Sequence, residues 1–248
     1  MILSLLPVHC TRYCEPFVGA GWVFLGYEGA DTYVLNDADP EVAAMWSYMK
    51  GHTLGDFLKE RFDLIRSEAV FRENKLIYKS KTWKSDAQLL YLYRYLQYYG
   101  VMGDYETPIA EGSSLRKKPM LPVENYEKVH SLLTLRSVHV TNEDWKDCCQ
   151  KHDAESVVFY FDPPWQGNIC QDRYGHHAVE YAEILNFIRQ AKGFVLMTCN
   201  ESALEGMDLL GLKVETVKQK YASCNFVKNL GGRKVEDSSV VFVVKESA

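Results

Sequence analysis

Asp162-Pro163-Pro164-Trp165 brings a carboxylate, a proline carbonyl and an aromatic ring next to one another. The segment 156–161 before it is an apolar run, which predicts a strand buried on both faces. Prolines lack a backbone N–H and have a fixed φ, so the strand must end there in a rigid, extended turn. Asp162 then lies at the carboxyl end of a central strand, where open α/β sheets bind their ligands.

This group of residues suits a flat molecule that carries an amino group. The carboxylate of Asp162 and the carbonyl of Pro163 can accept the two amino hydrogens, while the ring of Trp165 stacks on the flat face. Asp-Pro is also a common turn former. Taken alone, the segment therefore fits a strand-ending turn with a surface tryptophan equally well.

A glycine-rich segment near the start of the chain predicts a second site. Pro16-Phe17-Val18-Gly19-Ala20-Gly21 lies between an expected strand at 12–15 and an apolar helix. Its glycines allow a tight turn and close approach of a ligand, and the following helix offers N–H groups at its start. The next expected strand, 32–37, ends in Asp37, a typical ligand of a ribose diol. Asp37 could instead cap the helix that follows Pro40. Together these features favour a nucleoside-binding half-site.

The remaining pattern of helices and strands predicts an α/β fold. Helical spacing of apolar residues extends from 41 to 66, and the capping box Ser85-Asp86-Ala87-Gln88 opens another helix. Further expected elements are helices at 124–133, after 142–145, within 175–191 and at 203–210, and strands at 138–140, 194–198, 214–221 and 239–244, the last two antiparallel.

Composition restricts the class of protein. The chain of 248 residues is 47% hydrophobic and 25% charged, as in soluble globular proteins. No apolar run approaches the ~20 residues of a membrane span. The net charge of −5 argues against a broad nucleic-acid surface. Basic residues do cluster at Arg116-Lys117-Lys118 and at Lys228, Arg233 and Lys234, each a solvated loop or a local DNA contact.

The seven cysteines are scattered and form no C-x-x-C pair. This pattern is typical of reduced thiols in a cytoplasm. Cys148, Cys149 and His152 could touch a metal, but their spacing matches no known type of metal site. We therefore expect no metal.

With the glycine-rich segment and the Asp162-Pro163-Pro164-Trp165 segment taken together, the chain resembles the Dam-type DNA adenine-N6 methyltransferases, especially phage and prophage members. The resemblance covers roughly 5–244 and rests on five segments in the family's order. They are Cys14-Glu15-Pro16-Phe17-Val18-Gly19-Ala20-Gly21-Trp22-Val23-Phe24-Leu25 (its E-P-F-x-G-x-G-x-V-F-L), Asn36-Asp37 (its N-D), Asn142-x-Asp144-Trp145 (its N-x-D-[FW]), Asp162-Pro163-Pro164-Trp165 (its D-P-P-Y, with Trp for Tyr) and Asn229-Leu230-Gly231-Gly232-Arg233-Lys234 (its late glycine hairpin).

The resemblance implies a Rossmann-like S-adenosylmethionine-dependent methyltransferase fold, with a mixed sheet, an antiparallel C-terminal hairpin and a small, mostly helical recognition insert. It implies S-adenosylmethionine as cofactor and a flipped adenine of DNA as substrate. Asp162, Pro163, Pro164 and Trp165 would be catalytic. The implied cofactor residues are Glu15, Pro16, Phe17, Gly19, Ala20, Gly21, Asp37, Asp144 and Phe161. We expect the two basic clusters to contact DNA, namely Arg116, Lys117, Lys118, Lys228, Arg233 and Lys234.

The expected organisation is a cofactor-binding first half (1–50), a target-recognition region (51–135) and a catalytic second half (136–248). The family's N-terminal G-G-K element is absent, and no lysine precedes Lys50. We therefore expect weak cofactor binding unless Arg12, another basic side chain or an upstream segment closes the site.

Other functions fit parts of the pattern. Asp-Pro-Pro-aromatic also suits methylation of cytosine N4 or of RNA adenine, because each target is an amino group on a planar ring. A degenerate methylase that only binds DNA or a protein is a rival from another class. A nicotinamide oxidoreductase would use the glycine turn and Asp37 but leaves Asp162-Pro163-Pro164-Trp165 unexplained.

Overall fold

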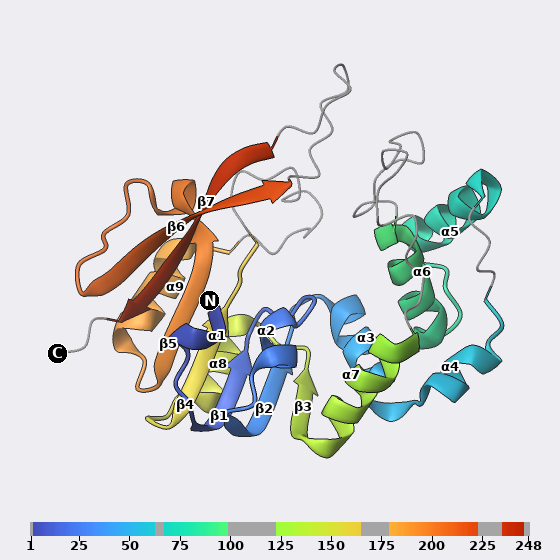
Figure 1. Ribbon diagram of the computed structural model, residues 1–248, viewed down its shortest axis with the longest axis horizontal. Coiled ribbons are helices and arrows are strands. Elements are labelled where there is room, and N and C mark those ends of the chain that lie inside the picture. Colours follow the sequence, from blue (N-terminus) through green and yellow to red (C-terminus); the bar gives the residue numbers. More distant parts are fainter. Residues whose placement is uncertain (1, 63–66, 99–122, 165–178, 223–234, 246–248) are drawn as a thin grey trace. The chain divides into compact units, whose positions relative to one another are not determined.

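The structure, a computed structural model, describes residues 2–62, 67–98, 123–164, 179–222 and 235–245 (Figure 1). The chain forms two compact units. The first unit consists of Met1–Ala43, Arg136–Ser223 and Arg233–Ala248, and the second of Ala44–Leu135 and Cys224–Gly232.

The described part of the first unit contains a seven-stranded mixed sheet of order β3-β2-β1-β4-β5-β7-β6 (Figure 1). Its strands are β1 (Cys10–Glu15), β2 (Ala30–Asn36), β3 (Ser137–Thr141), β4 (Val157–Phe161), β5 (Phe194–Asn200), β6 (Leu212–Ala222) and β7 (Val235–Lys245). Strands β1 to β5 are parallel, and β7 is antiparallel to both β5 and β6. The predicted Rossmann-like fold with an antiparallel C-terminal hairpin is confirmed.

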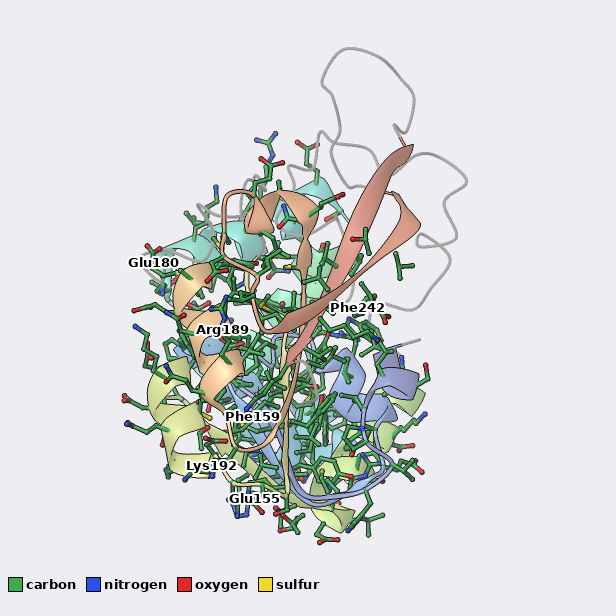
Figure 2. The ribbon with its side chains drawn as sticks, turned by 90° about the vertical axis from the view of Figure 1, so that its left-hand side faces the viewer. Glu155, Phe159, Glu180, Arg189, Lys192 and Phe242 are labelled. Carbon is green, nitrogen blue, oxygen red and sulfur yellow. The ribbon has the colours of Figure 1, made fainter. Side chains whose placement is uncertain are left out.

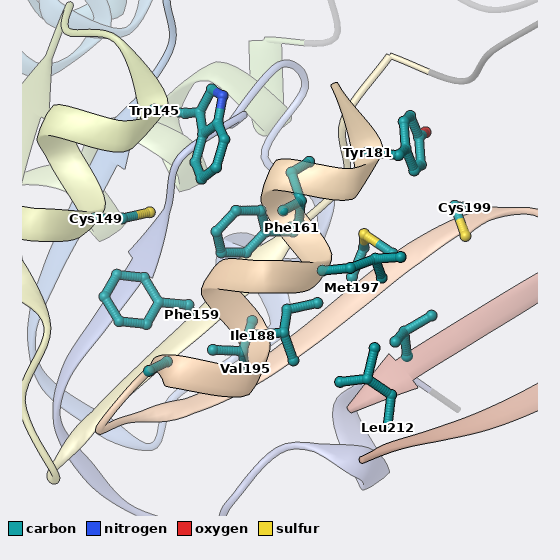
Figure 3. Packing of buried hydrophobic residues seen from close by; sticks show 14 of the residues in the cluster. Trp145, Cys149, Phe159, Phe161, Tyr181, Ile188, Val195, Met197, Cys199 and Leu212 are labelled. Atoms are coloured by element: carbon teal, nitrogen blue, oxygen red, sulfur yellow. The ribbon is translucent and has the colours of Figure 1, made fainter. Parts of the chain in front are cut away.

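Strand β4 lies in the middle of the sheet, and all five of its residues are buried. Side chains alternate between the two faces of a strand. Phe159 and Phe161 therefore share one face, where they pack beneath α8 (Trp145–His152) and α9 (Tyr181–Gln190) (Figure 3). Tyr160 points to the opposite face. Burial on both faces explains why the strand reads as an apolar run.

Short helices and turns complete the first unit. They include α1 (Ile2–Leu5), α2 (Trp22–Gly26) and a 3₁₀ helix at Glu201–Leu204. The predicted helix at 203–210 is wrong, because the helical turn ends at Leu204 and Gly206 adopts a φ of +72°. Arg189, which Figure 2 labels on α9, holds this segment instead. It donates hydrogen bonds to the carbonyls of Asp208 and Leu210.

Helices predominate in the described part of the second unit. They are α3 (Pro40–Gly51), which begins in the first unit, α4 (Leu54–Lys59), α5 (Glu68–Ser80), α6 (Asp86–Tyr98) and α7 (Val123–Leu135).

Local capping explains where the helix predictions for this unit are wrong. The helical pattern predicted from 41 to 66 is interrupted because Thr53 and Asp56 form a capping box that starts α4. Helix α5 was not predicted, and it begins after Ser67, whose hydroxyl accepts a hydrogen bond from Val70 N–H. At α6 the Ser85 hydroxyl caps as predicted, but the Gln88 side chain accepts from Lys84 N–H instead of Ser85 N–H.

Candidate active site

The carboxyl ends of β1, β2 and β4 carry the residues that the sequence singles out. These strands are adjacent and parallel, so their last residues, Glu15, Asn36 and Phe161, reach the same edge of the sheet. The glycine turn leaves β1 at this edge, and Asp162 leaves β4. The fold therefore brings the two predicted sites together at one edge.

The Asp-Pro-Pro turn is anchored from two neighbouring elements. Asp162 is exposed, whereas Pro163 is buried. The hydroxyl of Thr198 on β5 lies 3.0 Å from Asp162 Oδ1 and donates to it. The hydroxyl of Tyr181, at the start of α9, donates to the Pro164 carbonyl at 3.2 Å. The prolines and these two hydroxyls together hold an acidic side chain at an accessible position.

The glycine turn has the conformation that its sequence predicts. Gly19 and Gly21 adopt φ values of +43° and +63°, which are strained for residues with a side chain. A Cβ built on Gly19 would meet no described atom within 4 Å, so this side of the turn is open. Gly21 serves as the N-cap of α2 and supplies no side-chain cap.

Asp37 joins the glycine turn to the next helix. Its carboxylate accepts hydrogen bonds from Gly19 N–H at 2.9 Å and from Asp39 N–H at 3.0 Å. Asp39, in turn, accepts from Glu41 N–H in the first turn of α3. The capping contact to α3 is therefore made by Asp39, and Asp37 fixes the backbone of the turn itself.

Glu15 is 2% exposed and lies beneath the same turn. One of its oxygens accepts from Tyr13 Oη at 2.5 Å and from Phe24 N–H at 2.7 Å. It therefore caps α2 in place of Gly21. Burial raises the pKa of Glu15 to about 8; the two hydrogen bonds oppose this shift, and the negative charge of Asp162 adds to it. Two carboxyl groups thus lie close together at the ends of β1 and β4.

Aromatic rings and an asparagine connect the remaining predicted residues. Phe17, half-buried, packs against Trp145 and Phe161 at centroid distances of 6.1 and 5.8 Å. Phe161 itself is fully buried and supports the rings above it. Asp144 is exposed and is the N-cap of α8, where it accepts from Lys146 N–H.

Asn36 is a residue of this site to which the sequence assigned no role beyond its place in the N-D segment. It is completely buried, and its side chain donates to the carbonyls of Pro16 and Glu143 and accepts from Glu143 N–H and the Thr141 hydroxyl. It thereby holds the glycine turn, the end of β2 and the start of α8 in register. The sequence signal that could have indicated this role is an amide side chain directly before Asp37, near the end of an expected strand.

Comparison with known proteins identifies the family. The sequence model of the D12 class N6 adenine-specific DNA methyltransferases matches residues 1–203. The chain belongs to this family. It is an enzyme that transfers a methyl group from S-adenosylmethionine to the N6 amino group of adenine in DNA.

The other comparisons add nothing to this assignment. No curated protein matches the chain. Two solved structures align with it at low similarity. A conserved hypothetical protein of Streptococcus pyogenes is 9% identical with a TM-score of 0.39, covering 98% of this chain and 93% of that one. Precorrin 8w decarboxylase of Methanobacterium thermoautotrophicum is 11% identical with a TM-score of 0.38, covering 99% and 87%.

The residues at the carboxyl edge of the methyltransferase sheet fit its cofactor. An open glycine turn, an acid at the end of β2 and a half-buried aromatic ring suit a nucleoside with an amino-acid tail. Arg12 is not part of this edge. It lies toward the amino end of β1, where its guanidinium contacts His152 and Thr32, so Arg12 is not placed to close the cofactor site.

Cys148, Cys149 and His152 do not converge on one point. Cys148 and Cys149 are buried in the apolar core beside Cys14, and His152 contacts Arg12. Among the described residues there is no group of three side chains that could hold a metal ion, and no helix is long and apolar enough to cross a membrane.

Several predicted site residues lie outside the described residues. They are Trp165, Arg116, Lys117, Lys118, Lys228, Arg233 and Lys234.

Proposed function

We propose that Asp162 and the Pro163 carbonyl accept the amino hydrogens of the target adenine. The observation that carries this proposal is the Asp162 carboxylate, exposed at the end of β4 and held there by the Thr198 hydroxyl. Two fixed acceptors on the amino group direct its lone pair away from the ring and toward an incoming methyl group. Rigid prolines and buried anchors mean that little reorganisation is needed when the reaction occurs.

S-adenosylmethionine supplies an electrophilic methyl group on a positively charged sulfur. We assign binding of the methionine part of this cofactor to the turn from Phe17 to Gly21, and binding of its ribose to Asp37. The open space beside Gly19 and the bond between Gly19 and Asp37 support this assignment. We expect Glu15, Pro16 and Phe161 to support the turn from beneath. Asp144 would lie near the adenine or the amino group of the cofactor.

The amino nitrogen must lose one hydrogen when it gains the methyl group. The exposed carboxylate of Asp162 accepts that proton and passes it to solvent. This role agrees with an exposed acid whose Oδ1 accepts a hydrogen bond from the Thr198 hydroxyl.

Inside a duplex the N6 group cannot reach such a turn, so we propose that the target base is flipped out of the helix and stacks on Trp165. Along the chain, the cofactor-binding half (1–50) comes first and the catalytic half (136–248) comes last. The helical region 51–135, which separates them in the sequence, would read the target sequence. The basic residues at 116–118 and at 228–234 would contact phosphates. We also propose a cytoplasmic location, which agrees with free thiols at the described cysteines.

Asp162→Ala tests the central assignment. Transfer of label from S-adenosylmethionine to adenine-containing duplexes, followed by nucleoside mass analysis, should show N6-methyladenine with the wild type. The variant should lose about 100- to 1,000-fold in rate, the usual cost of one preorganised electrostatic contact. Calorimetry should show near-normal cofactor affinity.

Asp147→Ala is the matched control, because this exposed aspartate on α8 lies outside the proposed site. It should keep full activity. Near-normal turnover by Asp162→Ala would remove the proposal.

A further inference from the structure

The hydroxyl of Thr198 is the centre of a buried polar group behind Asp162. Thr198 is 2% exposed, and it follows Met197, the residue of β5 that pairs with Phe161 of β4. Its Oγ1 lies 2.9 Å from Tyr160 Oη, 3.0 Å from Asp162 Oδ1 and 3.3 Å from the Phe161 carbonyl oxygen. Two adjacent strands thus bring two hydroxyls and a carboxylate into one chain of hydrogen bonds.

The direction of this chain follows from what each group can do. A threonine hydroxyl has one hydrogen to donate, while a carboxylate and a carbonyl only accept. The carboxylate is the nearer and stronger acceptor, so Thr198 donates to Asp162. Tyr160 must then be the donor to Thr198. The chain runs from Tyr160 to Thr198 to Asp162.

The hydrogen bond from Thr198 orients the Asp162 carboxylate. The prolines restrict φ and the turn, but the terminal torsion of an aspartate is broad. A donor on Oδ1 sets the plane of the carboxylate, and that plane sets where both oxygens point. Tyr160 is 5% exposed and Thr198 is 2% exposed, so packing holds the donors in place.

We propose that Thr198, held in turn by Tyr160, is a positioning residue that orients the Asp162 carboxylate toward the adenine amino group. This role rests on the proposed function of Asp162. Thr198 and Tyr160 thus affect the reaction although neither residue touches the substrate.

Thr198→Val removes the hydroxyl and keeps the shape. We expect its single-turnover rate to fall about 10- to 100-fold, because a small misplacement of a reacting group has that effect. KM for DNA and the cofactor affinity should stay near the wild type. Thr198→Ser, which keeps the hydroxyl, should recover most of the rate, and Tyr160→Phe should show a smaller loss than Thr198→Val.

Thr32→Val is the matched control. Thr32 is a half-buried strand threonine whose hydroxyl donates to the Thr11 carbonyl, toward the amino end of β2. Its loss should leave the methylation rate unchanged. If Thr198→Val does not fold, Tyr160→Phe decides. A lower methylation rate at unchanged melting temperature supports the positioning role of Thr198 and Tyr160, and a wild-type rate overturns it.

A double-mutant cycle separates this inference from the proposed function. If Thr198 acts through Asp162, Thr198→Val should cost little more once Asp162 is already alanine. Additive losses, or a wild-type rate for Thr198→Val beside an inactive Asp162→Ala, would refute the positioning role of Thr198. Asp162 would then remain the acceptor of the adenine amino hydrogens. A fully active Asp162→Ala would instead refute the proposed function.

Discussion

Replacing Glu15 by glutamine should remove a large pH dependence from the stability of the methyltransferase. Glu15 is buried, and its pKa is raised from 4.5 to about 8. Between these values the folded chain holds a proton that the unfolded chain releases. The free energy of unfolding should therefore fall as the pH rises through this window.

The size of the effect follows from the shift. A difference of 8 − 4.5 = 3.5 pKa units, at ~1.4 kcal/mol per unit, corresponds to ~5 kcal/mol across the window. This is a large part of the ~5–15 kcal/mol that stabilises a typical domain. Glutamine is neutral at every pH, and its amide oxygen can still accept from Tyr13 Oη and Phe24 N–H.

Urea unfolding of the wild type and Glu15→Gln at several pH values from 5 to 9 measures the difference directly. The variant should gain stability over the wild type by up to ~1.4 kcal/mol per pH unit. Glu205→Gln, at an exposed glutamate, controls for the loss of one carboxyl group. Asp162→Asn should lower the upper end of the window, because the Asp162 charge adds to the shift. A constant difference between the two proteins from pH 5 to 9 would refute the argument.

Three further outcomes are expected. Gly19→Ala should lose ~1 kcal/mol of stability from its positive φ and bind S-adenosylmethionine more weakly in calorimetry; unchanged affinity would move the cofactor away from the turn. Trp165→Ala should be much slower than Trp165→Phe, since a stacked base contributes about 1–3 kcal/mol; equal rates would make Trp165 structural. Neutralising Lys228, Arg233 and Lys234 together should reduce the log–log salt slope of DNA binding by about 0.9 per lost phosphate contact, and an unchanged slope would place the DNA elsewhere.

Local patterns accounted for much of the fold. The apolar run of β4, its stop at Asp162, the glycine turn and the antiparallel hairpin of β6 and β7 each follow from neighbouring residues, because periodicity, proline and glycine act over short distances. The wrong helix predictions have the same cause, because these local signals act over short distances. A single capping contact at Thr53 and one glycine with positive φ, Gly206, outweighed the apolar spacing around them.

The sequence by itself determined which groups are available for chemistry, namely Asp162 with its prolines, the glycine turn and Asp37, and the order in which they occur. Only the tertiary structure decided what surrounds Asp162. Thr198 reaches it because β5 pairs with β4, and Glu15 lies near it because β1 pairs with β4 on the other side. Strand pairing joins residues far apart in the chain through backbone hydrogen bonds that carry no local sequence signature, so neither neighbour was visible before the sheet was assembled.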